Sequence, residues 1–194
     1  MGPTLDLFGD DDTAQSGREM LGEQSVVLRA YALPDAAALL AGVDAVTQQA
    51  PFRNMVTPGG YTMSVALTNC GRYGWTTDAH GYRYSRNDPL SGQPWPDMPI
   101  AFDDLARRAA AEAGFPGFAP DACLVNRYEP GSRLSLHQDK DERDYGWPIV
   151  SVSLGMPRCS CSAARTAQTR ASACRCSMAT WWSGAAWTGC AFMA

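Results

Sequence analysis

The sequence changes character after Pro157, and this change limits where a folded core can be built. Residues 158–194 contain no Leu, Ile, Val or Tyr and no His, Asp, Glu or Lys, yet they hold five of the seven cysteines. The inward faces of a β-sheet need β-branched and other large apolar side chains. We therefore expect residues 1–157 to supply the core. The whole chain of 194 residues is long enough for one domain.

Charge divides the remaining chain into two parts. Residues 1–25 carry six carboxylates against Arg18 alone and are predicted to form a loose acidic leader, and the remainder is close to neutral. Arginines gather in residues 52–86, where they form either a basic nucleic-acid surface or ordinary solvated charge. The N-terminus lacks the pattern of a secretory signal, and no apolar run reaches the length of a membrane helix. We expect no membrane association and a cytoplasmic location.

Hydrophobic periodicity predicts two helices and several short strands. A strand is expected over 25–33, a helix from Pro34 to Val46, and a second helix between Pro99 and Gly114. Residues 51–97 have the short alternating runs and turn residues of hairpins. Further strands are expected in 122–131, 132–142 and 148–155. This order predicts an α+β domain built on an antiparallel sandwich or jelly roll.

The segment Leu-Ser-Leu-His-Gln-Asp, residues 134–139, places an imidazole and a carboxylate on one face of a strand. His137 and Asp139 would then supply two of the three ligands of a facial triad, which suits Fe(II) and leaves positions open for a cosubstrate and O₂. Taken alone, this pattern also fits a structural histidine beside a turn. The other histidine, His80, lies in a loop rich in Gly and Asp and is predicted to be solvated.

Three blocks of sequence give this pattern its context, and together they resemble the AlkB family of Fe(II)- and 2-oxoglutarate-dependent nucleic-acid dioxygenases. The blocks are residues 51–84, 120–142 and 148–157. The resemblance implies a double-stranded β-helix, or jelly roll, with N-terminal helices. Its domain would span residues 26–157, with a nucleotide-recognition lid at 51–86.

Carried over by position, the resemblance assigns five roles. His137 and Asp139 would bind iron, and Asn126, Arg127 and Tyr128 would hold 2-oxoglutarate. Trp75 would stack on a flipped, alkylated base, and Asp141 would contact its exocyclic amino group. Six residues of the lid would position the nucleic-acid strand: Thr57, Tyr61, Met63, Tyr82, Arg83 and Tyr84. Chemistry on a paired base requires flipping it out, which explains the need for stacking surfaces.

The function implied by the resemblance is direct-reversal repair by a monomeric dioxygenase. With Fe(II), 2-oxoglutarate and O₂, the family oxidatively demethylates bases such as N1-methyladenine and N3-methylcytosine. The base is restored and formaldehyde is released. The expected substrate is alkylated single- or double-stranded DNA, with RNA as a second candidate.

The tail departs from the family, which continues with a His-Gly-Asp strand, a distal iron-binding histidine and two arginines. None of these is present in residues 158–194. When possible codons for the tail are read one base earlier, a compatible translation is H-G-D-V-V-V-W-G-G-L-D-R-L-R-F-H-G. Residues 180–183 would be the shifted image of its D-V-V-V run. We therefore interpret the tail as family sequence in the wrong frame, with C-terminal strands missing or out of frame.

Two alternatives come from other functional classes. One is an inactive product that at most binds nucleic acid through its lid. The other is a metal-binding tail in which four thiolates hold zinc or copper, although structural zinc sites usually have a wider cysteine spacing. These thiolates would belong to Cys159, Cys161, Cys174 and Cys176.

Overall fold

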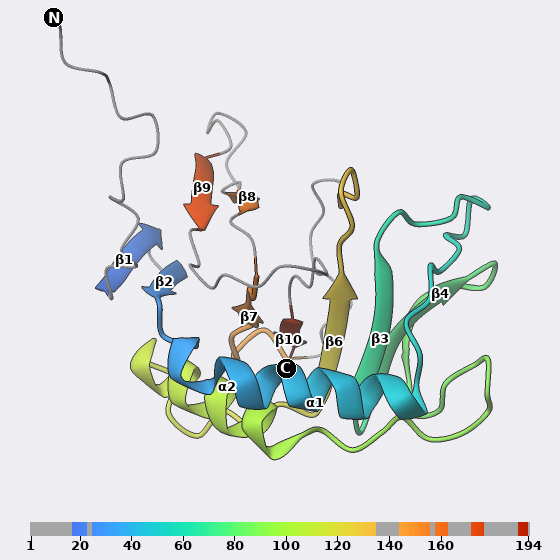
Figure 1. Cartoon of the computed structure of the whole chain (residues 1–194), viewed down its shortest axis with the longest axis horizontal. Helices are drawn as coiled ribbons and strands as arrows, with labels where there is room; N and C mark the ends of the chain where they lie inside the picture. Colours follow the sequence, from blue (N-terminus) through green and yellow to red (C-terminus); the bar gives the residue numbers. More distant parts are fainter. Residues whose placement is uncertain are drawn as a thin grey trace, which may run out of the picture.

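The structure is a computed structural model, and it describes residues 17–22, 25–134 and 144–155. It also describes the backbone of three strands nearer the C-terminus: β8 (Arg158–Ser162), β9 (Ser172–Cys176) and β10 (Cys190–Met193). These residues form an α+β fold in which two helices lie along one side of a set of strands (Figure 1).

The N-terminal segment is more ordered than a loose leader. Strand β1 (Gly17–Gly22) pairs antiparallel with β2 (Ser25–Arg29), and the Arg29 guanidinium forms an ion pair with Glu19. The prediction of a leader over residues 1–25 is wrong for residues 17–22. The prediction was based on charge alone, and charge does not indicate whether a segment can pair as a strand with the segment that follows it.

The two predicted helices are confirmed, with small shifts at their ends. A 3₁₀ turn (η1, Leu33–Asp35) contains Pro34, so α1 (Ala36–Gln49) begins two residues after the predicted start. Helix α2 (Ile100–Glu112) follows Pro99, and Gly114 adopts a positive φ of 100° just beyond its end. A positive φ is costly for other residues, so glycine suits this stop.

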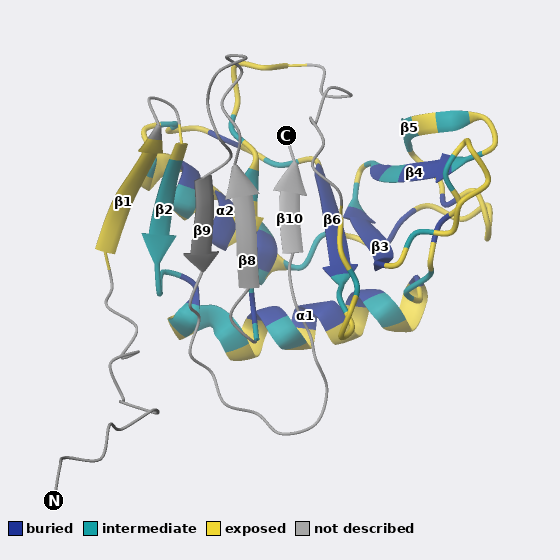
Figure 2. Cartoon of the chain, turned by 90° about the horizontal axis from the view of Figure 1, so that it is seen from above, coloured by how far each residue is buried: buried dark blue, intermediate teal, exposed yellow. Residues whose placement is uncertain are grey.

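A four-stranded sheet carries the hydrophobic core on its helix side. Its order is β3 (Ala66–Gly71), β6 (Ala122–Arg127), β10 and β7 (Val150–Val152), and each neighbouring pair is antiparallel. Side chains from α1, α2 and the sheet meet in one buried cluster, seen as the dark blue faces in Figure 2. Its members include Leu39, Val43, Phe102, Leu105, Cys123, Val125 and Val152.

A separate hairpin, β4 (Gly74–Asp78) and β5 (Gly81–Ser85), stands beside β3 and lies within the predicted lid. Its strands confirm the expectation of hairpins in 51–97. Of the strand expected over 132–142, residues 132–134 are irregular and 135–143 lie outside the described residues.

The C-terminal strands were predicted to be missing or out of frame; strands do form in this part of the backbone, so they are not missing, and the reading frame stays a prediction. Strand β10 pairs with both β6 and β7, and β8 pairs with β9. The reason is that sheet ladders join main-chain groups, which every non-proline residue carries. Low β-propensity of the tail therefore did not prevent pairing. Within the part of the chain described, neither helix has the length and apolar character required to cross a membrane.

The contact between the two helices yields a first prediction. A Cβ added at Gly42 in α1 would lie 2.8 Å from Cε1 of the buried Phe102 in α2. Gly42→Val should therefore lower the free energy of unfolding by about 1–3 kcal/mol through overpacking. Urea denaturation measures this change. Ala45→Val places the same side chain on the exposed face of α1 and is the control; equal losses in both variants would contradict the packing described.

Candidate functional site

Aromatic side chains line one face of the β4–β5 hairpin. Trp75 lies directly opposite Tyr84, and Thr77 lies opposite Tyr82. Directly opposite residues and residues two apart share a face of a strand pair, so all four side chains project the same way. The Trp75 and Tyr82 rings stack with centroids 5.7 Å apart and an interplanar angle of 24°. We call Trp75, Thr77, Tyr82 and Tyr84 the aromatic face.

A small apolar cluster connects the aromatic face with β3 and β6. Its buried centre is formed by Met55, Val65, Leu67 and Leu124. Trp75 and Tyr84 pack against this centre, as do Met63 and Tyr128. The structure therefore brings three predicted substrate-binding residues close to one predicted cosubstrate-binding residue.

The side chain of Asn69 fixes the backbone of Trp75. Its Nδ2 donates to the Trp75 carbonyl at 2.9 Å, and the Trp75 amide donates to its Oδ1 at 3.0 Å. Asn69 is fully buried. Gly74, which directly precedes Trp75, leaves no room for a side chain. An added Cβ would lie 2.4 Å from the Trp95 ring and 2.7 Å from Cβ of Asn69. The hairpin is thus seated closely on β3 and Trp95.

Arg83 lies on the opposite face of the hairpin from Tyr82 and Tyr84. Its guanidinium donates to both carboxylate oxygens of Asp78, at 2.9 and 2.6 Å. These bonds, and that from the His80 amide, hold the pKa of Asp78 well below its usual range. Arg83 is therefore placed to brace the hairpin and not to extend the aromatic face. The solvated position predicted for His80 is confirmed, since its side chain is 86% exposed.

Two further lid residues, Thr57 and Tyr61, belong to one tight turn. The Thr57 amide donates to the Tyr61 carbonyl at 2.9 Å, and the Tyr61 amide lies 3.2 Å from Oγ1 of Thr57. The ring of Tyr61 is 77% exposed. The turn thus presents an aromatic ring to solvent, apart from the small apolar cluster.

Strand β6 divides the three predicted cosubstrate residues between its two faces. Alternation puts Asn126 and Tyr128 on the face of Leu124, whereas Arg127 shares the face of Val125. The Arg127 guanidinium lies 4.9 Å from the Phe52 ring centroid and 3.4 Å from a carboxylate oxygen of Glu129. The structure therefore does not bring Arg127 together with the other two.

The side chain of Asn126 has one buried polar atom without a hydrogen bond to the described residues. Its Oδ1 is buried and accepts no hydrogen bond from the described residues. Leaving a buried amide group unsatisfied costs about 1–3 kcal/mol. Since the oxygen and nitrogen of an amide are assigned from their partners, either end can face a ligand there. A primary amide aimed into the site fits a carboxylate such as that of 2-oxoglutarate.

The predicted iron ligands His137 and Asp139 lie outside the described residues, as does Asp141. Among the residues that are described, no group of three His, Cys, Asp or Glu side chains is arranged to hold a metal. The four tail cysteines of the alternative metal site lie on β8 and β9, whose side chains are also outside the description.

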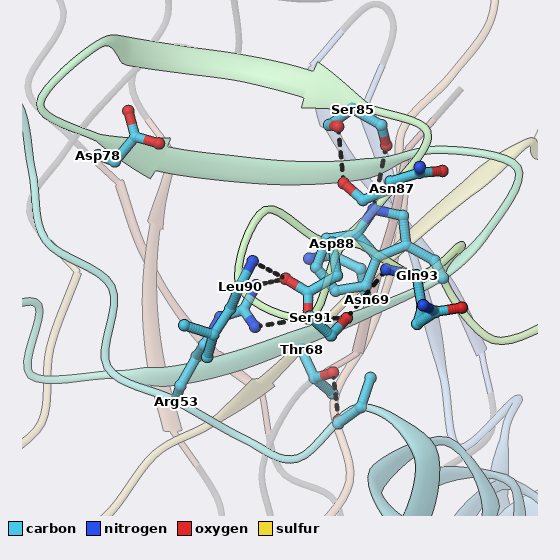
Figure 3. A network of polar contacts seen from close by, with 12 residues as sticks. Arg53, Thr68, Asn69, Asp78, Ser85, Asn87, Asp88, Leu90, Ser91 and Gln93 are labelled. Carbon is cyan, nitrogen blue, oxygen red and sulfur yellow. Dashed lines mark hydrogen bonds and ion pairs between the residues drawn. The ribbon is translucent and has the colours of Figure 1, made fainter.

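Sequence reasoning missed the polar support beneath the hairpin, shown in Figure 3. The Arg53 guanidinium binds both carboxylate oxygens of Asp88 and lies 5.4 Å from the Trp95 ring centroid. Burial disfavours the charged form of Asp88, but Arg53 and the amide of Leu90 outweigh it, so its pKa lies below the usual value. Trp95 in turn donates to the Ser85 carbonyl at 3.0 Å. Asn69 and Asp88 were overlooked because nothing local to the sequence distinguishes them.

Comparison with known proteins defines the class to which this fold and site belong. The 2OG-Fe(II) oxygenase superfamily matches residues 25–174, which extends beyond Pro157. A solved structure, that of OsALKBH1, superposes with a TM-score of 0.67 over 91% of this chain and 83% of its own, at 20% identity. At that identity the likeness concerns the fold alone.

Closer relatives narrow the class. The alpha-ketoglutarate-dependent dioxygenases AlkB of Salmonella typhimurium and Escherichia coli are each 58% identical over 153 residues, which is 79% of this chain and 69% of theirs. An AlkB homolog of Caulobacter vibrioides is 51% identical over 118 residues, 61% of this chain and 52% of its own. The chain belongs to the AlkB family of Fe(II)- and 2-oxoglutarate-dependent dioxygenases.

The paired hydrogen bonds of Asn69 yield a second prediction. Asn69→Ala removes both and leaves the Trp75 amide without its buried acceptor, which should cost about 1–3 kcal/mol. Hydrogen exchange at the Trp75 amide should accelerate accordingly. Asn69→Asp keeps the acceptor and should protect that amide better than Ala does. The control is Asn87→Ala, an exposed position nearby; Trp75 exchange that responds equally to both alanine variants would refute the role of Asn69.

Proposed function

We propose that this chain binds alkylated bases in single-stranded or flipped-out DNA, and RNA as a second substrate, as part of oxidative demethylation. The observation that carries the proposal is the aromatic face, in which Trp75 stacks with Tyr82 and packs on a cluster that reaches Tyr128, just after β6. Membership of a family of Fe(II)- and 2-oxoglutarate-dependent dioxygenases supports the reaction type.

In this proposal residues 26–157 form the jelly roll of the oxygenase domain, with 51–86 as the nucleotide-recognition lid. The protein is a cytoplasmic monomer. A base seated on the Trp75 ring gains stacking energy on the order of 1–3 kcal/mol. The exposed half of Tyr82 extends that surface. Met63 and Tyr84 pack against the same buried centre as Trp75.

The cosubstrate would lie next to β6. Asn126 would hydrogen-bond a carboxylate of 2-oxoglutarate, with Tyr128 alongside on the same face, and His137 and Asp139 would bind the iron. When bound, iron would use O₂ and 2-oxoglutarate to hydroxylate an N-methyl group, with 2-oxoglutarate converted to succinate and CO₂ and the methyl carbon leaving as formaldehyde. The position of Arg127 on the other face favours a supporting role through Phe52 and Glu129.

In this proposal the lid would bind nucleic acid, but the tail would prevent catalytic turnover. We propose that residues 158–194 are an out-of-frame product that lacks the third iron ligand and the arginine for 2-oxoglutarate. An arginine makes paired, charge-assisted hydrogen bonds to a carboxylate, and its loss weakens cosubstrate binding. This favours the second candidate function, an inactive chain that binds nucleic acid through its lid. Metal binding by the tail is a further alternative, because the pairing of β8 with β9 brings together the two strands that carry the four cysteines, although no cysteine lies directly opposite another.

The binding part has a direct test in Trp75→Ala. This change should weaken binding to a single-stranded oligonucleotide containing N1-methyladenine by roughly 5- to 150-fold, because the base loses its stacking partner. Fluorescence anisotropy measures the affinity. Trp147→Ala removes an exposed tryptophan that packs on Phe118, away from the hairpin, and is the matched control. Equal affinities for the two variants would place Trp75 in the core and not in a binding site.

The catalytic part is tested by restoring the reading frame after Pro157. The restored protein should form succinate from 2-oxoglutarate, and the 194-residue chain should not. In the restored protein, His137→Ala or Asp139→Ala should abolish succinate formation, since removing one of three ligands leaves iron weakly held. Near-normal turnover in either variant would overturn the metal assignment, and turnover by the 194-residue chain would overturn the interpretation of the tail.

A further inference from the structure

A tyrosine and an arginine lie just beyond the Trp75–Tyr84 pair, at the end of the hairpin away from its turn. One step beyond that pair lie Tyr73 and Arg86, two residues before Trp75 and two after Tyr84. The Arg86 guanidinium carbon lies 5.5 Å from the Tyr73 ring centroid, and Nη2 of Arg86 donates to the Tyr73 hydroxyl at 3.3 Å. Both residues lie one position outside the β4–β5 ladder, next to its Gly74–Ser85 pair, and so stand at the end of the hairpin nearest Trp75 and Tyr84.

The backbone holds this end of the hairpin in place. The amide of Tyr73 donates to the Asp121 carbonyl at 3.2 Å, and the amide of the preceding Arg72 donates to the same oxygen at 2.8 Å. Tyr73 also forms an isolated parallel bridge with Ala122 at the start of β6. The Tyr73 backbone is therefore fixed to the sheet, while Arg86 is exposed beside it.

Arg86 retains capacity for an anion. A guanidinium has five N–H donors, and the bond to Tyr73 uses one of them. Among the residues that the structure describes, neither Arg72 nor Arg86 forms an ion pair with a carboxylate. One exposed cation, Arg86, thus lies beside an aromatic ring at one end of the hairpin.

We propose that Tyr73 and Arg86 bind the nucleotide that flanks the base on Trp75, with the ring stacking on its base and the guanidinium on its phosphate. This inference rests on the proposed function, because it needs a base at Trp75. An aromatic surface with a cation beside it is how single-stranded nucleic acid is held without reading its sequence. A planar guanidinium also matches the oxygen geometry of a phosphate.

The two residues predict different signatures in a titration with salt. Each phosphate contact to a single strand contributes about 0.7 to the slope of log affinity against log salt concentration. Arg86→Gln should therefore reduce the magnitude of that slope by about 0.7, and Arg86→Lys should keep it. Tyr73→Leu should lower affinity by roughly 5-fold or more with the slope unchanged, whereas Tyr73→Phe, which keeps the ring, should bind almost normally.

The experiment uses the 194-residue chain and two single-stranded oligonucleotides, one containing N1-methyladenine and one unmodified. Affinity is measured by anisotropy over a series of salt concentrations. Arg107→Gln removes one positive charge from α2 and is the control for net charge. A thermal melt of each variant identifies any loss of affinity that comes from unfolding. The Arg86→Gln effect should be equal on both oligonucleotides, because a phosphate carries no methyl mark.

The outcomes separate this inference from the proposed function. A slope in Arg86→Gln equal to that in Arg107→Gln overturns the phosphate contact, and normal affinity in Tyr73→Leu overturns the stacking contact. If Trp75→Ala leaves binding of the methylated oligonucleotide unchanged, the proposed function fails even where Arg86→Gln alters the slope. Loss of affinity in Trp75→Ala with no response at Tyr73 or Arg86 keeps the proposed function and rejects the flanking site.

Discussion

The antiparallel pairing of β3 with β6 is the constraint on which both sides of the molecule depend. Its register sets Cys70 opposite Cys123 and Leu67 opposite Asn126. Since successive side chains alternate, one face of the pair supplies the core beneath α1 and α2, and the other supplies the small apolar cluster. A slip by one residue would exchange the two sets, turning Asn126 toward the helices and Val125 toward the site. The position of every candidate residue near β6 follows from this register.

Support for the hairpin comes from polar groups that reach across the chain. Asn69 in β3 binds the backbone of Trp75. Arg53 forms an ion pair with Asp88 in the loop that follows β5 and also lies over the Trp95 ring. Figure 3 shows this network below the hairpin ribbon. Buried polar groups fix orientation because each alternative position leaves a donor or acceptor without a partner. The aromatic face therefore has a defined direction relative to β6.

Sequence patterns predicted part of this architecture. Hydrophobic periodicity, with the start residues Pro34 and Pro99 and the stop residue Gly114, was sufficient to predict both helices, because those signals are local. They were also sufficient for hairpins in the lid. Patterns did not reveal that Arg127 faces Phe52, since the register that decides its face depends on a strand more than fifty residues earlier. Nor did they show the pairing of β10 between β6 and β7, because main-chain hydrogen bonds leave little trace in side-chain chemistry.

The close contact of Gly74 with Trp95 and Asn69 has a consequence for the shape of the binding partner. In the proposed function, the aromatic face would keep a fixed direction toward the base, because the backbone at Gly74 is packed directly against Trp95 and Asn69. The deformation needed to bring a base and the face together must then be made by the nucleic acid. Unstacking a paired base costs a few kcal/mol, whereas a base in a single strand or at a damaged pair is extruded at less cost. A fixed aromatic face would therefore favour a base in a single strand or at a damaged pair over a base in an intact duplex.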